Sequence, residues 1–186
     1  LTGSKFVCEE MNHMEAGEFL LGYEESHGYI GGMHIRDKDG VLAAMLLCET
    51  AAWHKTQGKT LLDALEDLYE EYGYYIDEQD SFVFEGAKGA KEMQKIMARL
   101  RSRRGSVFAP LGKPDKILDY EKGVDELPRS NVLKFFFPNG SWVAVRPSGT
   151  EPKIKFYYCL RGKDQRQAED LYEAVQTSVE EFLRTF

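Results

Sequence analysis

The pattern of apolar residues predicts three helices in the first two thirds of the chain. Residues 41–54 are apolar nearly all round, which predicts a buried helix rather than one at the surface. A second helix is expected after Thr60, because Thr60 and Asp63 have the spacing of a capping box and Gly73 stands where a C-terminal cap would. The third carries one apolar face at helical spacing, formed by Met93, Ile96, Met97 and Leu100.

Short runs of strand-forming residues predict five strands, at residues 74–76, 81–84, 132–137, 142–145 and 153–160. The pair Asn139-Gly140 lies between the third and fourth runs and is typical of a β-hairpin. A closing helix is expected from about Asp164, because a single apolar stripe follows it. The chain therefore reads as mixed α/β, ending in a small α+β domain whose antiparallel sheet is covered by a helix on one face.

A domain break is expected near residues 112–116. Two prolines and two glycines interrupt the periodic pattern between Ala109 and Pro114. The charge changes across the same region, because residues 1–115 carry the whole net charge of −7 and residues 116–186 are neutral. Within the neutral part, residues 132–163 hold six cations against a single acidic residue, Glu151. An acidic chain thus keeps one local basic zone.

Composition excludes some functions. The chain has 186 residues with 42% hydrophobic and 30% charged residues, and its longest apolar run, 41–48, is too short to span a bilayer. A net charge of −7 argues against a general nucleic-acid binder. The three cysteines are widely spaced and form no CxxC pair, which favours a reduced, cytoplasmic protein.

The segment 146–153 carries the most informative chemistry. Its sequence, Arg-Pro-Ser-Gly-Thr-Glu-Pro-Lys, lies between two predicted strands. Prolines stiffen the loop, and Gly149 permits backbone conformations that other residues avoid. The amides of residues 148–151, with the Ser148 and Thr150 hydroxyls and the Arg146 guanidinium, are expected to converge as a phosphate nest. The alternative is an ordinary tight loop whose hydroxyls bond to their own backbone.

A second segment, 21–29, presents polar side chains between glycines. If its middle is extended, Glu24 and Ser26 face one way while Glu25 and His27 face the other. A carboxylate beside a hydroxyl suits vicinal sugar hydroxyls. A glycosidase pair of carboxylates conflicts with that alternation, and a metal site using Glu25, His27 and His34 lacks recognisable ligand spacing. A solvated acidic turn stays open as the alternative.

The third segment, 34–40, contains Asp37 and Asp39 but does not fit a calcium loop, because its glycine comes too early and no closing Glu follows. Asp39 is predicted to cap the next helix. Arg36 and Lys38 are then cations near the Glu24 turn that suit a phosphorylated ligand, with a solvated basic pair as the alternative.

Together these segments resemble the α-D-phosphohexomutase family, the phosphoglucomutases and phosphomannomutases. The opening Leu-Thr-Gly-Ser-Lys-Phe is similar to the family's Thr-Gly-x-Lys loop, Gly-Tyr-Glu-Glu-Ser-His-Gly to its sugar-specificity loop, and Arg-Pro-Ser-Gly-Thr-Glu-Pro-Lys to its phosphate-binding loop. The resemblance implies part of the mixed-sheet third domain at 1–112 and the fourth domain at 116–186.

The resemblance also implies residue roles. Glu24 and Ser26 would bind sugar hydroxyls, with help from Lys38 and Lys5. The residues that would grip the phosphate of a hexose phosphate substrate are Arg146, Ser148, Gly149 and Thr150.

In the family, a phosphoserine and Mg²⁺ act through a glucose 1,6-bisphosphate-type intermediate. Neither the phosphoserine loop nor the aspartate-rich metal loop occurs in these 186 residues. Both would lie in N-terminal domains of the same chain, so this part is expected to bind without catalysing and to hold no metal itself.

Two other functions are considered. The first is a free-standing phosphosugar-binding module. The second is nucleic-acid binding by the basic zone at 132–163, which the net charge opposes and which the aromatic residues do not favour, because they are expected to pack beneath the closing helix. These aromatic residues are Phe135, Phe137 and Trp142.

Overall fold

The computed structural model describes residues 3–15, 17–24, 28–84, 86–149 and 151–186. The chain forms two compact units, Leu1–Leu68 and Tyr69–Phe186, so the division falls inside helix α3 (Leu61–Tyr72). The sequence places the domain break at 112–116 instead. The difference arises because residues 74–111 pair with, or pack against, the sheet of the second unit.

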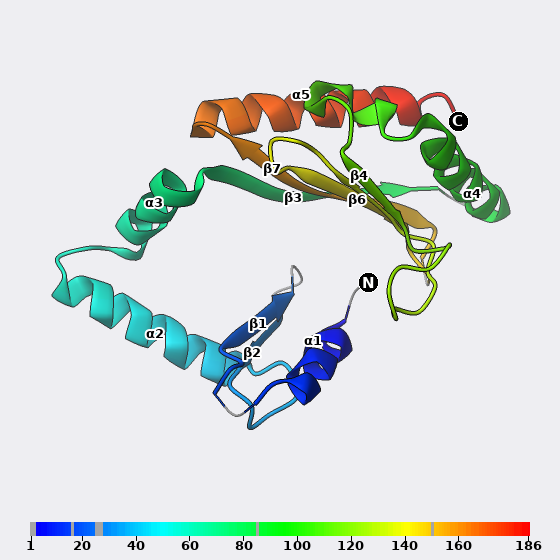
Figure 1. Ribbon diagram of the computed structural model, residues 1–186. Coiled ribbons are helices and arrows are strands. Elements are labelled where there is room, and N and C mark those ends of the chain that lie inside the picture. Colours follow the sequence, from blue (N-terminus) through cyan, green and yellow to red (C-terminus); the bar gives the residue numbers. More distant parts are fainter. Residues whose placement is uncertain (1–2, 16, 25–27, 85, 150) are drawn as a thin grey trace. The chain divides into compact units, whose positions relative to one another are not determined.

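The first unit contains helices and one β-hairpin (Figure 1). Before α3, its elements are α1 (Ser4–Glu10), η1 (Met11–His13), β1 (Leu21–Glu24), β2 (Gly28–Gly31) and α2 (Gly40–Thr56). Its buried hydrophobic cluster consists of Met11, Phe19 and Ile30. The described strands are antiparallel, whereas the family resemblance implies a mixed sheet in this region.

The second unit is a five-stranded antiparallel sheet with helices on one face (Figure 1). In chain order its elements are β3 (Tyr74–Val83), α4 (Gly86–Arg103), η2 (Ser106–Leu111), β4 (Lys116–Asp119), β5 (Leu133–Phe136), β6 (Trp142–Pro147), β7 (Lys153–Gly162) and α5 (Gln165–Leu183). The strand order is β3-β7-β6-β5-β4. The mixed α/β class and the small antiparallel domain are thus confirmed.

The core of the second unit is built from alternate residues along its strands. On β7, Ile154, Phe156, Tyr158 and Leu160 are buried, and the residues between them are half-buried on the opposite face. The buried side chains meet Val175, Val179 and Phe182 of α5 and the apolar face of α4. The predicted apolar face of α4 is confirmed.

Local signals set the ends of several elements as predicted. The Asn139-Gly140 turn joins β5 to β6, with Phe136 opposite Trp142. Asp164 caps α5 by accepting a hydrogen bond from the N–H of Gln167 at 2.8 Å. Thr60 and Asp63 form the reciprocal bonds of a capping box. The two runs at 74–76 and 81–84, however, form one strand, β3, which pairs with β7 along its whole length.

Helix α2 forms where the sequence predicts it, but the prediction that it is buried is wrong. None of its residues is buried, and Val41, Met45 and Trp53 are well exposed. The hairpin strand β2 packs against it at Gly31, where a Cβ would lie 2.7 Å from Cδ2 of Leu42. Its remaining apolar sides have no such cover among the described residues of the first unit, so an apolar sequence here does not mean a buried helix.

No helix in the described part of the chain combines the length and apolar character needed to cross a bilayer.

Candidate functional site

The first candidate element is the β1–β2 hairpin. Its strands pair antiparallel with Glu24 opposite Gly28. Residues 25–27, and with them the predicted sugar ligand Ser26, lie outside the described part. The prediction that Glu24 and Ser26 face one way therefore stays a prediction.

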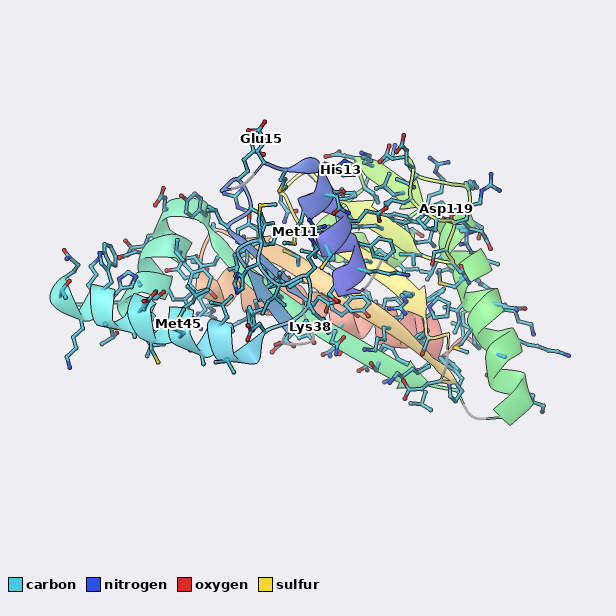
Figure 2. All side chains as sticks on the ribbon, turned by 90° about the horizontal axis from the view of Figure 1, so that it is seen from below. Met11, His13, Glu15, Lys38, Met45 and Asp119 are labelled. Carbon is cyan, nitrogen blue, oxygen red and sulfur yellow. The ribbon has the colours of Figure 1, made fainter. Side chains whose placement is uncertain are left out.

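Glu24 and Lys38 form an ion pair at this hairpin. The Nζ of Lys38 lies 2.7 Å from Oε2 of Glu24, and only 12% of the Glu24 side chain is exposed. A Cβ at position 28 would lie 2.2 Å from Cδ of Lys38, so the lysine stem crosses the hairpin where Gly28 has no side chain. Figure 2 labels Lys38. The structure therefore brings together two of the four predicted sugar-binding residues.

The backbone beside Lys38 explains how the lysine is placed. The N–H of Asp39 donates to the carbonyl of Tyr29 on β2 at 2.8 Å. The Asp39 carboxylate accepts from the N–H groups of Val41 and Leu42, each at 3.0 Å, which confirms its predicted capping role. Lys38 is thus held between a strand and a capped helix start.

The other two predicted cations of this unit have different surroundings. Arg36 donates a hydrogen bond to Oδ1 of Asn12, and its carbonyl accepts from the Cys8 thiol at 3.2 Å. Lys5 is exposed on α1, with its ammonium 5.0 Å from the centroid of the Phe6 ring. Neither contact joins these cations to Glu24.

The second candidate element is the loop between β6 and β7, in the second unit. Arg146 stands opposite Lys155 in the register of the two strands, and Pro147 stands opposite Ile154. The N–H of Ser148 donates to the carbonyl of Lys153 at 2.8 Å, which closes the loop. Thr150 lies outside the described residues. The strands thus bring cationic side chains to the base of a short, hydrogen-bonded loop.

The predicted nest of converging amides is wrong for two of its members. The N–H of Ser148 already bonds to Lys153, and the N–H of Glu151 donates to Oγ of Ser148 at 3.2 Å. This hydroxyl-to-backbone bond is the pattern of the alternative reading, an ordinary tight loop. Gly149 is not in the left-handed region, and a Cβ there would meet nothing within 4 Å. Gly149 therefore provides open space beside the loop rather than an unusual backbone conformation.

The charges around the loop are partly paired. Nζ of Lys153 lies 2.6 Å from Oε2 of Glu151, so this ion pair spans the end of the loop. The Lys155 ammonium donates to Oε1 of Gln79 on β3 at 3.3 Å. Pro152, at the same end, accepts a hydrogen bond from the N–H of Phe84 at 2.7 Å, which ties the loop to the edge of the sheet.

The sheet face opposite the helices carries groups that the sequence analysis did not single out. Nζ of Lys134 lies 3.7 Å from the centroid of the Trp142 ring, and burial lowers the pKa of Lys134. On β7, burial raises the pKa of the Cys159 thiol to about 11, with Asp77 adding to the rise. The period-2 alternation of the strands identifies this face once the register is known.

This face also corrects one prediction about the aromatic residues. Phe135 and Phe137 pack in the core beneath α5 as expected. Trp142 does not, because it contacts Lys134 on the opposite face of the sheet.

Among the described residues, no group of three or more His, Cys, Asp or Glu side chains is arranged to hold a metal ion.

Two family models match the chain. Residues 1–72 match the phosphoglucomutase/phosphomannomutase alpha/beta/alpha domain III, and residues 83–178 match the phosphoglucomutase/phosphomannomutase C-terminal domain. Most of β3 lies between the two matched regions.

Curated relatives and a solved structure agree with these matches. The phosphoglucomutase of Staphylococcus epidermidis is 38% identical over 86% of this chain and 31% of its own length. The phosphoglucomutase of Staphylococcus haemolyticus is 36% identical over 94% of this chain and 34% of its own length. The open form of the Paramecium phosphoprotein pp63/parafusin, described as a phosphoglucomutase, superimposes with a TM-score of 0.70 at 26% identity, over 96% of this chain and 32% of that one. The chain therefore spans about a third of the length of these relatives.

Proposed function

Because the chain belongs to the phosphoglucomutase/phosphomannomutase family, we propose that it is the substrate-binding, C-terminal part of an enzyme that interconverts hexose 1-phosphate and hexose 6-phosphate. Its relatives are named as phosphoglucomutases, which supports this reading and does not favour a free-standing binding module. In this proposal the first unit contributes the sugar contacts and the second unit the phosphate contacts.

The observation that carries the proposal is the β6–β7 loop. Its sequence matches the family's phosphate-binding loop, and Arg146 and Lys155 meet across the strands at its base. A guanidinium binds two oxygens of a phosphate at once, so Arg146 is assigned the substrate phosphate. Gly149 leaves open space beside it for the phosphate oxygens. Thr150 completes the set on the strength of the resemblance.

The internal bonds of the loop add to the assigned role of Ser148. Its hydroxyl accepts from the N–H of Glu151 at 3.2 Å, which holds the loop in shape beside the proposed phosphate position. Ser148 thus stiffens the loop, and its contact with the phosphate is assigned by resemblance. A loop held this way loses little conformational freedom on binding, which favours affinity.

The sugar side of the proposal rests on the Glu24–Lys38 pair. A shielded carboxylate accepts hydrogen bonds from sugar hydroxyls, while the ion pair with Lys38 holds that carboxylate in place. Ser26 and Lys5 are assigned to the same sugar by resemblance. The selection among glucose, mannose and aminosugars would depend on these contacts.

The chemical step is assigned to the rest of the protein. A phosphoserine, the bisphosphate intermediate and bound Mg²⁺ belong to N-terminal domains by resemblance, and the described residues here offer no three-donor metal site. Mg²⁺ would neutralise charge on the transferring phosphoryl group. This part of the chain would orient the substrate and hold its non-reacting phosphate.

A binding assay that separates the two halves of the ligand tests the proposal. Glucose 1-phosphate and inorganic phosphate are titrated into the chain by calorimetry. Arg146→Gln is expected to weaken both ligands by about tenfold or more, because a charged hydrogen-bond pair is lost. Glu24→Gln is expected to weaken glucose 1-phosphate but leave phosphate within about twofold.

The matched control is Arg166→Gln, which removes the same charge from an exposed position on α5. Equal affinities for the Arg146→Gln variant and the control would overturn the phosphate assignment. In the full-length enzyme, Arg146→Gln should lower kcat/KM for glucose 1-phosphate by about tenfold or more.

A further inference from the structure

A basic groove follows the outer edge of the sheet in the second unit, well apart in sequence from the β6–β7 loop. Strand β4 is the last strand in the sheet order and pairs with β5. Two cavities of about 660 and 330 Å³ lie along it and share Arg104 and Ile117 in their linings. Together they make a continuous groove between the end of α4 and the edge strand.

The lining of the groove is positively charged. The first cavity is lined by Arg103, Arg104 and Lys113 against one carboxylate, Asp115. Among the described residues no acidic side chain lies within ion-pair distance of these three cations. This is unusual in a chain whose net charge is −7, because unneutralised cations on an acidic protein attract an acidic ligand.

The second cavity is more balanced. Arg101 is bound by Asp119, by Glu121 and by the Asn131 side chain, so it is a structural cation. Asp119 is labelled in Figure 2. Lys122 also lies 3.8 Å from the Asp119 carboxylate, and Val124 and Leu133 supply apolar surface. The groove therefore combines a cationic wall with an apolar floor.

The backbone at Arg104 lies at the C-terminal end of helix α4. Arg104 has a φ of 49° in the left-handed region, directly after α4 ends at Arg103. Glycine is the usual residue at this position, and a side chain there costs about 1 kcal/mol. Arg104 is also the cation that both cavities share.

The backbone groups on the outer edge of β4 indicate which kind of ligand fits the groove. The N–H of Tyr120 donates to the carbonyl of Val132, which sets the alternation of the ladder with β5. The N–H and C=O groups of Ile117 and the N–H of Asp119 then point away from β5, whereas the carbonyl of Asp119 already accepts from the N–H of Lys122 at 3.0 Å. An extended peptide is the ligand that satisfies such groups, by adding a strand to the sheet.

We propose that this groove binds an extended acidic peptide segment of a partner protein, which pairs with β4 as an added strand. Its backbone bonds to the outer edge of β4, its acidic side chains meet Arg103, Arg104 and Lys113, and its alternate apolar side chains lie on the floor near Ile117. A nucleic acid offers no backbone that matches the edge strand, and the overall charge of the chain repels it.

The test uses a fluorescein-labelled peptide of alternating glutamate and valine, followed by anisotropy as the full 186-residue chain is added. Saturable binding is expected at micromolar concentration, weakening about tenfold or more between about 50 and about 300 mM NaCl. Arg104→Gly is expected to weaken it about tenfold, and because glycine relieves the positive φ, the variant should fold at least as stably.

Matched controls separate charge from strand addition. Lys95→Gln removes one charge from the exposed surface of α4 outside the groove and should leave affinity within about twofold. The same peptide with alternate amide nitrogens methylated keeps its charge but loses strand pairing, and should bind about tenfold more weakly.

Several results would overturn the proposal. These are equal binding of the methylated peptide, equal binding by the Arg104→Gly variant, or tighter binding of a single-stranded oligonucleotide of the same charge. Self-association of the chain that Arg104→Gly abolishes would also overturn it, by giving the groove to a second copy. None of these results bears on phosphate binding by Arg146, so the two proposals fail independently.

Discussion

The two compact units differ in how much apolar surface they bury for themselves. The second unit encloses a continuous core that includes Phe108, Phe135 and Phe156, each with 0% exposure. The first unit encloses a cluster of three buried residues and leaves the apolar helix α2 exposed. The difference shows that an apolar sequence makes a core only where strands or helices supply a facing surface, which the β3–β7 sheet does and the short hairpin does not.

The largest test of this contrast compares two apolar truncations. Phe156→Ala removes a fully buried ring and should lower the free energy of unfolding by about 3–5 kcal/mol. Leu47→Ala, on α2 where the side chain is 59% exposed, should change it by less than about 0.5 kcal/mol. Urea unfolding followed by circular dichroism measures both. Similar losses in the two variants would mean that α2 is covered in solution.

Removing a helix cap is expected to have a smaller effect on stability. In both units the cap is an aspartate at the start of a helix. Asp164→Ala removes the cap of α5 and should lower the stability of the second unit by about 1 kcal/mol. Asp39→Ala removes the cap of α2, which packs on little besides β2, so the helix should fray with little change in the main unfolding transition. Backbone hydrogen exchange distinguishes the two outcomes, since only the first should expose protected amides throughout the unit.

A finer comparison uses one lysine from each unit, Lys38 and Lys134, whose charges are held in different surroundings. Lys38→Met breaks the ion pair with Glu24 and should cost about 1 kcal/mol, because the lysine is 44% exposed and solvent weakens the pair. Burial lowers the pKa of Lys134 below its usual value of 10.5, so its charged form is disfavoured in the folded state.

The sign for Lys134 follows from linkage. Stability associated with this group is full above pH 10.5 and falls as the pH drops through the lowered pKa of the folded state. Lys134→Met should therefore remove that part of the alkaline pH dependence and leave stability at neutral pH equal or slightly higher. A clear loss at neutral pH would show that the contact with Trp142 outweighs the cost of burying the charge.

The smallest effect concerns cysteine reactivity rather than stability. Cys48 is exposed on α2, whereas burial and then Asp77 raise the pKa of Cys159 to about 11. Iodoacetamide at pH 8 should therefore label Cys48 well before Cys159, since the thiolate is the reacting form. Labelling of Cys159 should rise as the pH approaches 11, and Asp77→Asn should move that rise to lower pH. Mass spectrometry of digested protein reports each site separately.

The features that sequence predicted well are those set by neighbouring residues. The Asn139-Gly140 hairpin, the Asp39 and Asp164 caps and the apolar face of α4 all follow from short-range patterns. The position of the unit boundary did not, because β3 joins the second unit by pairing with β7, far along the chain. Local periodicity carries no information about such a pairing.

The candidate site likewise has some features that the sequence predicts and others that it does not. The chemistry of Arg146 and the closeness of Lys38 to Glu24 could be anticipated from residue types and order. The amide directions in the β6–β7 loop could not, because they depend on backbone angles that one sequence does not specify. The assignments of Ser26 and Thr150 rest on resemblance, since both residues lie outside the described part.

The pairing of β3 with β7 has a consequence for how the protein is made. Tyr74 leaves the ribosome long before its partner Gly162, so β3 emerges with nothing to pair with. During that interval its tyrosines and isoleucine are open to other chains, and the second unit completes its sheet only after β7 has been translated. Synthesis speed across residues 84–152, and chaperones that shield a nascent edge strand, would therefore affect the yield of folded protein more than any change within β3 itself.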